Sequence, residues 1–181
     1  MNICHKHKFI LWAPPRTAAR FVHSALNGIG GLSQLTHSIG VPLDGAGYSI
    51  VCTVRNPYTR ALSAWKWLNQ IHKNEYSPHD FKEFVRKRMP ITSVRPVSQE
   101  LGHMLEMVKY LVRVESVEAD LRALPWVPST QVFPPNAYRS NYHARVPSDL
   151  YDEETRKRVH QLYHEDFVEF DYDPNVIPNK F

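Results

Sequence analysis

The stretch Val51-Cys-Thr-Val-Arg-Asn-Pro-Tyr-Thr-Arg-Ala-Leu-Ser-Ala-Trp65 joins an apolar run to the start of a helix. Its β-branched residues predict a buried strand over residues 48–54, because strands buried on both faces are continuously hydrophobic. Pro57 suits the first turn of a helix, where no backbone N–H is needed. Arg55 therefore lies at the exit of a strand, and Ser63 lies on the helix that follows. This arrangement favours the binding of an anion.

A second connection between a strand and a helix lies upstream, in Trp12-Ala-Pro-Pro-Arg-Thr-Ala-Ala-Arg20. The apolar run over residues 8–13 predicts a first strand, and residues 17–27 predict a helix that a group of glycines ends. The two arginines of the loop supply positive charge, and Thr17 supplies a hydroxyl. The loop lacks the G-x-x-x-x-G-K-[ST] pattern of nucleoside triphosphatases, which argues against a nucleotide kinase.

Strands and helices alternate along the rest of the chain. Alternation of this kind predicts an α/β fold with a central parallel sheet that helices flank, in which ligands bind beyond the carboxyl ends of the strands. On the helix that begins at Pro57, Ala61, Trp65 and Leu68 recur at helical spacing and predict its buried side. Further strands are expected at 32–36 and 109–114, and further helices after 80, after 116, and as one long helix from 152 that includes Phe170.

The composition indicates one globular domain. The chain has 181 residues, 43% of them hydrophobic, with a formal net charge of +4, so we expect a single domain over 1–181 with a core at about 8–173 and a proline-punctuated tail. The small basic excess suits an anionic ligand and gives no reason to expect nucleic acid. The two cysteines, Cys4 and Cys52, indicate reduced thiols rather than a disulfide or metal site. The helix expected after residue 80 has a basic face, which carries Lys82, Arg86, Lys87 and Arg88. We interpret this face as solvated, and the alternative is that it binds an acidic polysaccharide.

No apolar run approaches the roughly 20 residues that span a bilayer, and no signal peptide pattern follows the charged start. We therefore expect a soluble, cytoplasmic protein without a membrane span. The sequence leaves the oligomeric state open.

Taken together, the two loops resemble those of sulfotransferases that use 3′-phosphoadenosine 5′-phosphosulfate, especially those that act on carbohydrates. Residues 113–120 are similar to the R-[FV]-E-x-[LV]-x-x-D segment of that family, and residues 163–172 are similar to its Y-x-x-D-F-x-x-F-x-Y ending. The likeness spans roughly residues 8–173 and implies a three-layer fold like that of the P-loop nucleoside triphosphatases. The family motif R-x-P-[YF]-x-R-x-x-S is matched position for position by Arg55, Pro57, Tyr58, Arg60 and Ser63.

The resemblance implies a role for each matching residue. Arg16 would meet the transferring sulfuryl group, and Thr17 with the following backbone amides would hold the 5′-phosphate. Arg55 and Ser63 would bind the 3′-phosphate of the donor, whose product is adenosine 3′,5′-bisphosphate. No metal is implied, because fixed cations can stabilise the phosphate leaving group. The expected donor site consists of Pro15, Arg16, Thr17, Ala18, Ala19, Arg20, Arg55, Ser63, Arg139 and Ser140.

The first loop departs from the family in two ways. Ala18 and Ala19 stand where the family usually has glycine, serine or threonine, so the loop loses hydroxyl donors, and Arg20 would supply charge in their place. Arg16 stands where lysine is common, and it offers a planar fork instead of a point charge. These departures keep a second hypothesis open, in which the chain is a non-catalytic protein that binds the nucleotide or an anionic glycan.

Transfer to a hydroxyl needs a general base. His37 is the preferred candidate, because it follows the expected strand at 32–36 and because histidine has an ordinary pKa of about 6.5. Asp44 is the alternative, although its Asp-Gly sequence is also typical of a turn. The expected catalytic residues are therefore Arg16 and His37, which would act in an in-line transfer of a sulfuryl group to a hydroxyl, expected on a carbohydrate.

Overall fold

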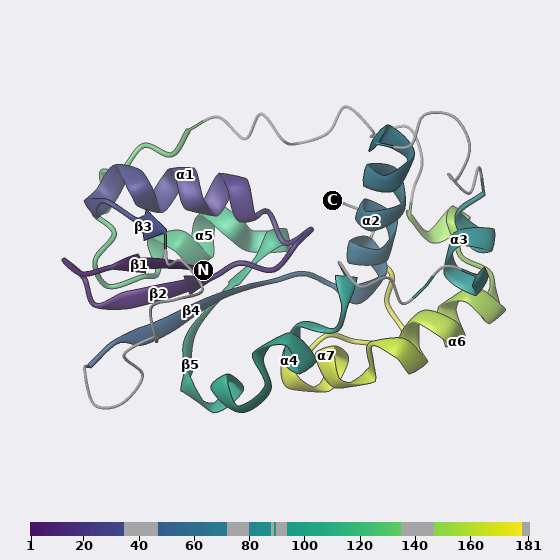
Figure 1. Ribbon diagram of the computed structural model, residues 1–181. Coiled ribbons are helices and arrows are strands. Elements are labelled where there is room, and N and C mark those ends of the chain that lie inside the picture. The colour runs from purple at the N-terminus through teal and green to yellow at the C-terminus, as the bar shows by residue number, and fades with distance from the viewer. Residues whose placement is uncertain (35–46, 72–79, 88, 90–93, 135–146, 179–181) are drawn as a thin grey trace. The chain divides into compact units, whose positions relative to one another are not determined.

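The chain forms two compact units. One consists of Met1–Val54 with His103–Tyr138, and the other of Arg55–Gly102 with Arg139–Phe181. The expectation of a single domain over 1–181 stays a prediction. The structure, a computed structural model (Figure 1), describes residues 1–34, 47–71, 80–87, 89, 94–134 and 147–178.

The first unit contains a five-stranded sheet in the order β3-β1-β2-β4-β5. The three strands β2, β4 and β5 run parallel, with Trp12 paired with Cys52 and Cys52 paired with Leu111. This confirms the α/β class and a largely parallel sheet. The strands are β1 (Asn2–Cys4), β2 (Phe9–Trp12), β3 (Ser33–Gln34), β4 (Ser49–Val54) and β5 (Val108–Arg113).

Helices α1 (Ala19–Gly30) and α5 (Val117–Arg122) share one buried cluster with this sheet. Phe9 and Leu11 alternate along β2 toward that cluster, as a pleated strand requires. Burial of each such side chain contributes about 1.5–3 kcal/mol. At the end of β5, Asp120 of α5 accepts a 2.7 Å hydrogen bond from the Arg113 N–H, which fixes the turn into that helix. The aspartate of the 113–120 segment is therefore a structural residue.

The amino-terminal hairpin differs from the sequence expectation. Strand β1 was not expected, and it pairs antiparallel with both β2 and β3, so the sheet is not wholly parallel. The expected strand at 32–36 is present as the two-residue β3. The segment 5–8 is the turn between β1 and β2, and His7 is half-buried with its ring stacked 6.3 Å from that of Trp126. Cys4 and Cys52 are both buried, and neither forms a disulfide.

The second unit is helical. Tyr58 and Leu62 of α2 enter its apolar core, and Ala61 is fully buried while Trp65 and Leu68 pack against the same cluster. This confirms the buried side that the helical spacing predicted. Its α-helices are α2 (Pro57–Ile71), α3 (Phe81–Lys87), α4 (Val97–Leu101), α6 (Glu153–Leu162) and α7 (His164–Glu169). Short 3₁₀ helices occur in the chain at Gly102–Met107, Val114–Ser116 and Pro147–Leu150.

The long carboxyl-terminal helix expected from 152 is in fact two helices, which break at Tyr163 (φ −119°, ψ 24°). Helix α6 begins with a capping box, and the hydrogen bonds from Thr155 hold the pKa of Asp152 down at about 2. At the break the Tyr163 hydroxyl donates a 2.5 Å hydrogen bond to the Val94 carbonyl. The apolar spacing continues across the break, which is why the sequence pattern did not reveal it.

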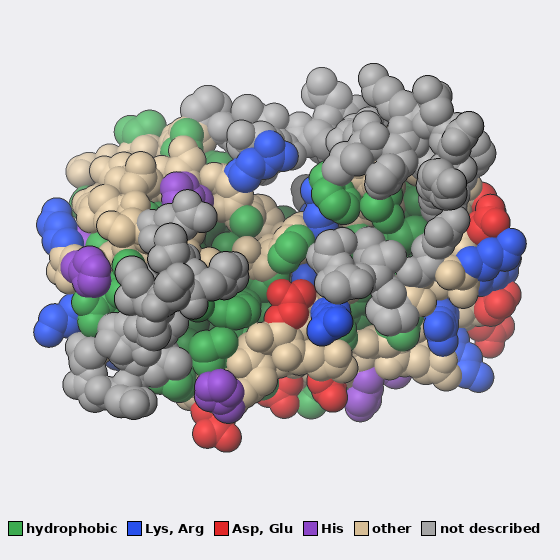
Figure 2. All heavy atoms as spheres, viewed as in Figure 1, with side chains coloured by type: hydrophobic (Ala, Val, Ile, Leu, Met, Phe, Trp, Pro, Cys, Tyr) green, Lys and Arg blue, Asp and Glu red, His purple; other side chains and the backbone are tan. Residues whose placement is uncertain are grey.

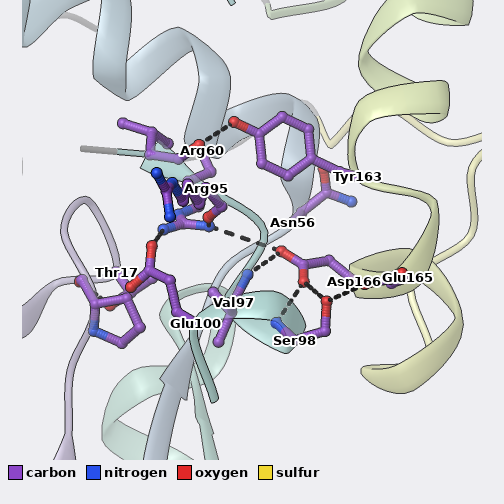
Figure 3. A network of polar contacts seen from close by, with 12 residues as sticks. Thr17, Asn56, Arg60, Arg95, Val97, Ser98, Glu100, Tyr163, Glu165 and Asp166 are labelled. Carbon is purple, nitrogen blue, oxygen red and sulfur yellow. Dashed lines mark hydrogen bonds and ion pairs between the residues drawn. The ribbon is translucent and has the colours of Figure 1, made fainter. Parts of the chain in front are cut away.

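A buried ion pair joins α2 to the elements around it (Figure 3). The Arg60 side chain is fully buried, and its Nη1 donates a 2.7 Å hydrogen bond to the Arg95 carbonyl. The same Nη1 lies 3.7 Å from Oδ2 of Asp166, and Nη2 lies 3.5 Å from Oε1 of Glu100. Burial raises the pKa of Glu100, and the Arg60 charge opposes that rise. A buried guanidinium needs such partners, because an unpaired buried charge is very costly.

Asp166 has a second function as the cap of α4 (Figure 3). Its carboxylate accepts 2.8 Å hydrogen bonds from the N–H groups of Val97 and Ser98 and another from the Ser98 hydroxyl. The residue at the N-cap position, Pro96, makes no side-chain cap of its own. One carboxylate thus satisfies the start of α4 and compensates the Arg60 charge.

Substitution Asp166→Asn should lower the free energy of unfolding by about 3 kcal/mol, because it removes the charge that compensates buried Arg60. Urea denaturation at pH 7 measures this loss. The matched control is Glu165→Gln, since Glu165 accepts a longer, 3.3 Å hydrogen bond from the Ser98 hydroxyl. Equal stability of the two variants would show that Asp166 does not carry the network.

Candidate functional site

The connection from β2 to α1 has an unusual backbone. The chain leaves β2 at Trp12 and enters α1 at Ala19, and both Arg16 (φ 70°) and Ala18 (φ 56°) adopt left-handed conformations. Loops of alternating handedness direct N–H groups into a concave nest that binds anions. The first N–H groups of a helix also lack acceptors within the helix. This loop is therefore built to receive an anion.

Two cations lie close together where this loop meets α1. Arg16 is half-buried, and burial lowers the pKa of its guanidinium, with the Arg20 charge lowering it further. Like charges kept together in a partly buried position favour the approach of an anion, which would relieve their repulsion. The structure thus brings the expected pair Arg16 and Arg20 together.

The Thr17 hydroxyl forms its hydrogen bonds with other groups of the protein. It is fully buried, donates a 2.6 Å hydrogen bond to the Pro14 carbonyl, and lies 2.6 Å from Oγ1 of Thr53 on β4. The expected contact of Thr17 with a phosphate therefore has to come from its backbone N–H. Of the neighbouring expected residues, Pro15 is exposed and Ala19 is the first residue of α1.

A pocket of about 400 Å³ adjoins this loop at the amino end of α1. Its polar lining includes Arg20 and His23, which lie one helical turn apart. The sequence reasoning missed His23, although its spacing of three residues from Arg20 could have indicated it. The pocket is lined by Met1, Asn2, Leu11, Ala13, Ala19, Arg20 and His23.

The second group of polar residues lies on α2. Arg55 is half-buried, and its Nε donates a 3.1 Å hydrogen bond to Oγ1 of Thr59. The Asn56 side chain caps the helix by accepting a 3.0 Å hydrogen bond from the Tyr58 N–H. Ser63 follows two turns into the helix with only 9% of its surface exposed. Arg55 is thus fixed along the face of α2 that carries Thr59 and Ser63.

Lys66 lies on the same face and was missed by the sequence reasoning. It is half-buried; burial lowers the pKa of its amine, and the Arg55 charge lowers it further. Its spacing of three residues from Ser63 was visible in the sequence, but its burial beside Arg55 was not. This face of α2 therefore combines two cations with a nearly buried hydroxyl.

The expected site residues divide between the two units. Arg16, Thr17 and Arg20 belong to the first unit, whereas Arg55 and Ser63 belong to the second. Arg60 matches the motif but was not assigned to the phosphate, and its guanidinium is buried against Arg95, Glu100 and Asp166. His37, Asp44, Arg139 and Ser140 lie outside the described residues.

The basic face of α3 is paired with carboxylates. Lys82 and Arg86 each lie 3.2 Å from Asp152, Arg86 lies 2.7 Å from Glu154, and Lys87 lies 3.0 Å from Glu83. Figure 2 shows the resulting mixture of blue and red side chains over α3 and α6. This pairing with carboxylates supports the interpretation of the basic face as solvated and argues against an acidic polysaccharide as its partner. Arg88 lies outside the described residues.

The described part of the chain has neither a metal-binding cluster nor a membrane-spanning helix. It contains no group of three or more histidine, cysteine, aspartate or glutamate side chains that could hold a metal ion. Within the same residues, no helix has the length and apolar character needed to cross a membrane.

Comparison with known proteins found one family. A model described as "Sulfotransferase family" matches residues 32–173, which include all of α2 with Arg55 and Ser63. The loop that carries Arg16 lies before the matched segment. No curated protein and no solved structure matches the chain.

Substitution Ala18→Gly should raise the free energy of unfolding by about 1 kcal/mol, because glycine adopts the left-handed backbone of this position without the strain that a Cβ causes. Thermal denaturation of both proteins measures the change. The control is Ala25→Gly in the middle of α1, which should lose at least about 1 kcal/mol. Destabilisation of similar size at both positions would contradict the strain at Ala18.

Proposed function

This chain belongs to the sulfotransferase family, and we propose that its donor is 3′-phosphoadenosine 5′-phosphosulfate and that its acceptor is a hydroxyl of a carbohydrate. The proposal rests chiefly on one observation, the polar face of α2. There Arg55 and Ser63 stand at the positions of the family's R-x-P-[YF]-x-R-x-x-S motif, and Arg55 is held by Thr59. A half-buried arginine beside a hydroxyl suits a phosphate monoester.

The donor would contact two strand-to-helix connections. Arg55 and Ser63 bind the 3′-phosphate, and the positive charge of Arg55 beside Lys66 supports this assignment. The backbone N–H groups of residues 17–20 hold the 5′-phosphosulfate, which the left-handed loop around Ala18 supports. Arg139 and Ser140 complete the 3′-phosphate site in this proposal.

The donor, when bound, supplies the sulfuryl group and a phosphate leaving group. In the proposed reaction a bond forms between the acceptor oxygen and sulfur while the bond between sulfur and the leaving phosphate oxygen breaks in line. Arg16 stabilises the negative charge that develops on the leaving oxygen, and its neighbour Arg20 adds to the positive field. His37 accepts the proton of the acceptor hydroxyl.

The pocket beside α1 supports a place for the acceptor. Its volume of about 400 Å³ lies in the range of small-molecule sites, and Arg20 and His23 offer hydrogen-bond donors to a hydroxylated ligand. Leu11 and Ala13 provide an apolar surface for the carbon face of a sugar. A carbohydrate acceptor is consistent with this mixed lining.

Substitution Arg55→Ala should weaken binding of adenosine 3′,5′-bisphosphate by about 2–3 kcal/mol, or roughly 30- to 150-fold, because it removes a charge-assisted contact to phosphate. Isothermal titration calorimetry measures the affinity. Lys87→Ala removes the same charge from an exposed, paired position on α3 and should leave the affinity unchanged. Failure of the unsubstituted protein to bind the nucleotide at millimolar concentration would refute the proposed donor.

Substitution His37→Ala should abolish sulfuryl transfer while nucleotide affinity stays unchanged, since the base acts on the acceptor alone. Transfer of radioactive sulfate from the donor to a panel of neutral and acidic oligosaccharides measures turnover, and calorimetry measures binding. Asp44→Asn is the companion variant and should retain activity. Retained turnover in His37→Ala would show that His37 is not the general base. Nucleotide binding without transfer by the unsubstituted protein would favour the alternative of a non-catalytic binding protein.

A further inference from the structure

Resting on the proposed nucleotide donor, we infer that Lys66 is a third group that binds the 3′-phosphate, together with Arg55 and Ser63. Lys66 stands outside the R-x-P-[YF]-x-R-x-x-S pattern, which ends at Ser63. The assignment therefore concerns a residue that only the geometry of α2 brings into the site.

Helical register places Lys66 beside Ser63. Helix α2 runs without interruption over Pro57–Ile71. At about 100° per residue, positions 59, 63 and 66 lie within about 60° of one another around the helix axis. These three residues therefore form one stripe along α2.

The two cations approach Ser63 from opposite directions. Arg55 precedes the helix, and its side chain extends forward to Thr59, with 3.1 Å between Nε and Oγ1. Helical side chains tilt toward the amino end, so Lys66 extends back over the turn that carries Ser63. Ser63, of which only 9% is exposed, therefore stands on the part of α2 toward which both cations extend.

The electrostatics agree with this convergence. Both Arg55 and Lys66 are half-buried, and the Arg55 charge lowers the pKa of the Lys66 amine in addition to the effect of burial. Two half-buried cations that repel each other are compensated best by a doubly charged anion between them. A phosphate monoester carries nearly two negative charges at neutral pH and can accept hydrogen bonds from both cations and the hydroxyl.

The decisive experiment measures the affinities of adenosine 3′,5′-bisphosphate and adenosine 5′-monophosphate by calorimetry for each variant. Lys66→Met should weaken binding of the bisphosphate by roughly tenfold or more and change the affinity for the monophosphate by less than about twofold, since only the first ligand carries a 3′-phosphate. Lys66→Arg keeps the charge and should stay within about threefold of the unsubstituted protein. Lys87→Met is the charge-matched control, on an exposed side chain of α3.

The results separate this inference from the proposed function. If the unsubstituted protein binds no bisphosphate, the donor assignment and the role of Lys66 both fail. If it binds the bisphosphate and Lys66→Met behaves like Lys87→Met, only the role of Lys66 is overturned. Equal loss of affinity for both nucleotides also overturns it, because that result indicates a structural effect. Lys66→Gln, checked by circular dichroism, serves as the second variant if Lys66→Met does not fold.

Discussion

The buried pair of Arg60 and Asp166 is the interaction on which the second unit depends. Arg60 is on α2, Asp166 is on α7, and the same carboxylate caps α4. A buried charge without its partner is very costly, so Arg60 and Asp166 stay paired. The pair therefore fixes α2 against two other helices. The stripe of Thr59, Ser63 and Lys66 lies on that same helix, and Arg55 precedes it. This network therefore holds the helix that carries the candidate phosphate site.

The first unit holds its loop by different means. The hydroxyls of Thr17 and Thr53 lie 2.6 Å apart, which ties the loop before α1 to strand β4. Left-handed backbone at Arg16 and Ala18 then directs the N–H groups of the loop, although alanine at position 18 adopts this conformation at a cost in stability. Strain of this kind is common at functional sites and agrees with a loop whose shape serves a ligand.

The sequence predicted the parts of the fold that have strong local signals. The β-branched run before Arg55 and the proline at 57 indicated β4 and the start of α2 within one or two residues. The three-residue strand β1 escaped prediction because its partners lie in β2 and β3, and no period can show in three residues. Arg55 and Arg60 both belong to the motif, and the sequence does not show that Arg60 is fully buried while Arg55 is half-buried. Lys66 was missed because the sequence does not show that its side chain is half-buried and close to Arg55.

The most direct test of this account is a crystal structure of the protein with adenosine 3′,5′-bisphosphate. We expect 3′-phosphate oxygens within about 3 Å of the Arg55 guanidinium and the Ser63 hydroxyl, with Arg60 still paired to Asp166. A nucleotide bound with its 3′-phosphate away from α2, or an Arg60 that leaves Asp166 to contact the phosphate, would contradict it.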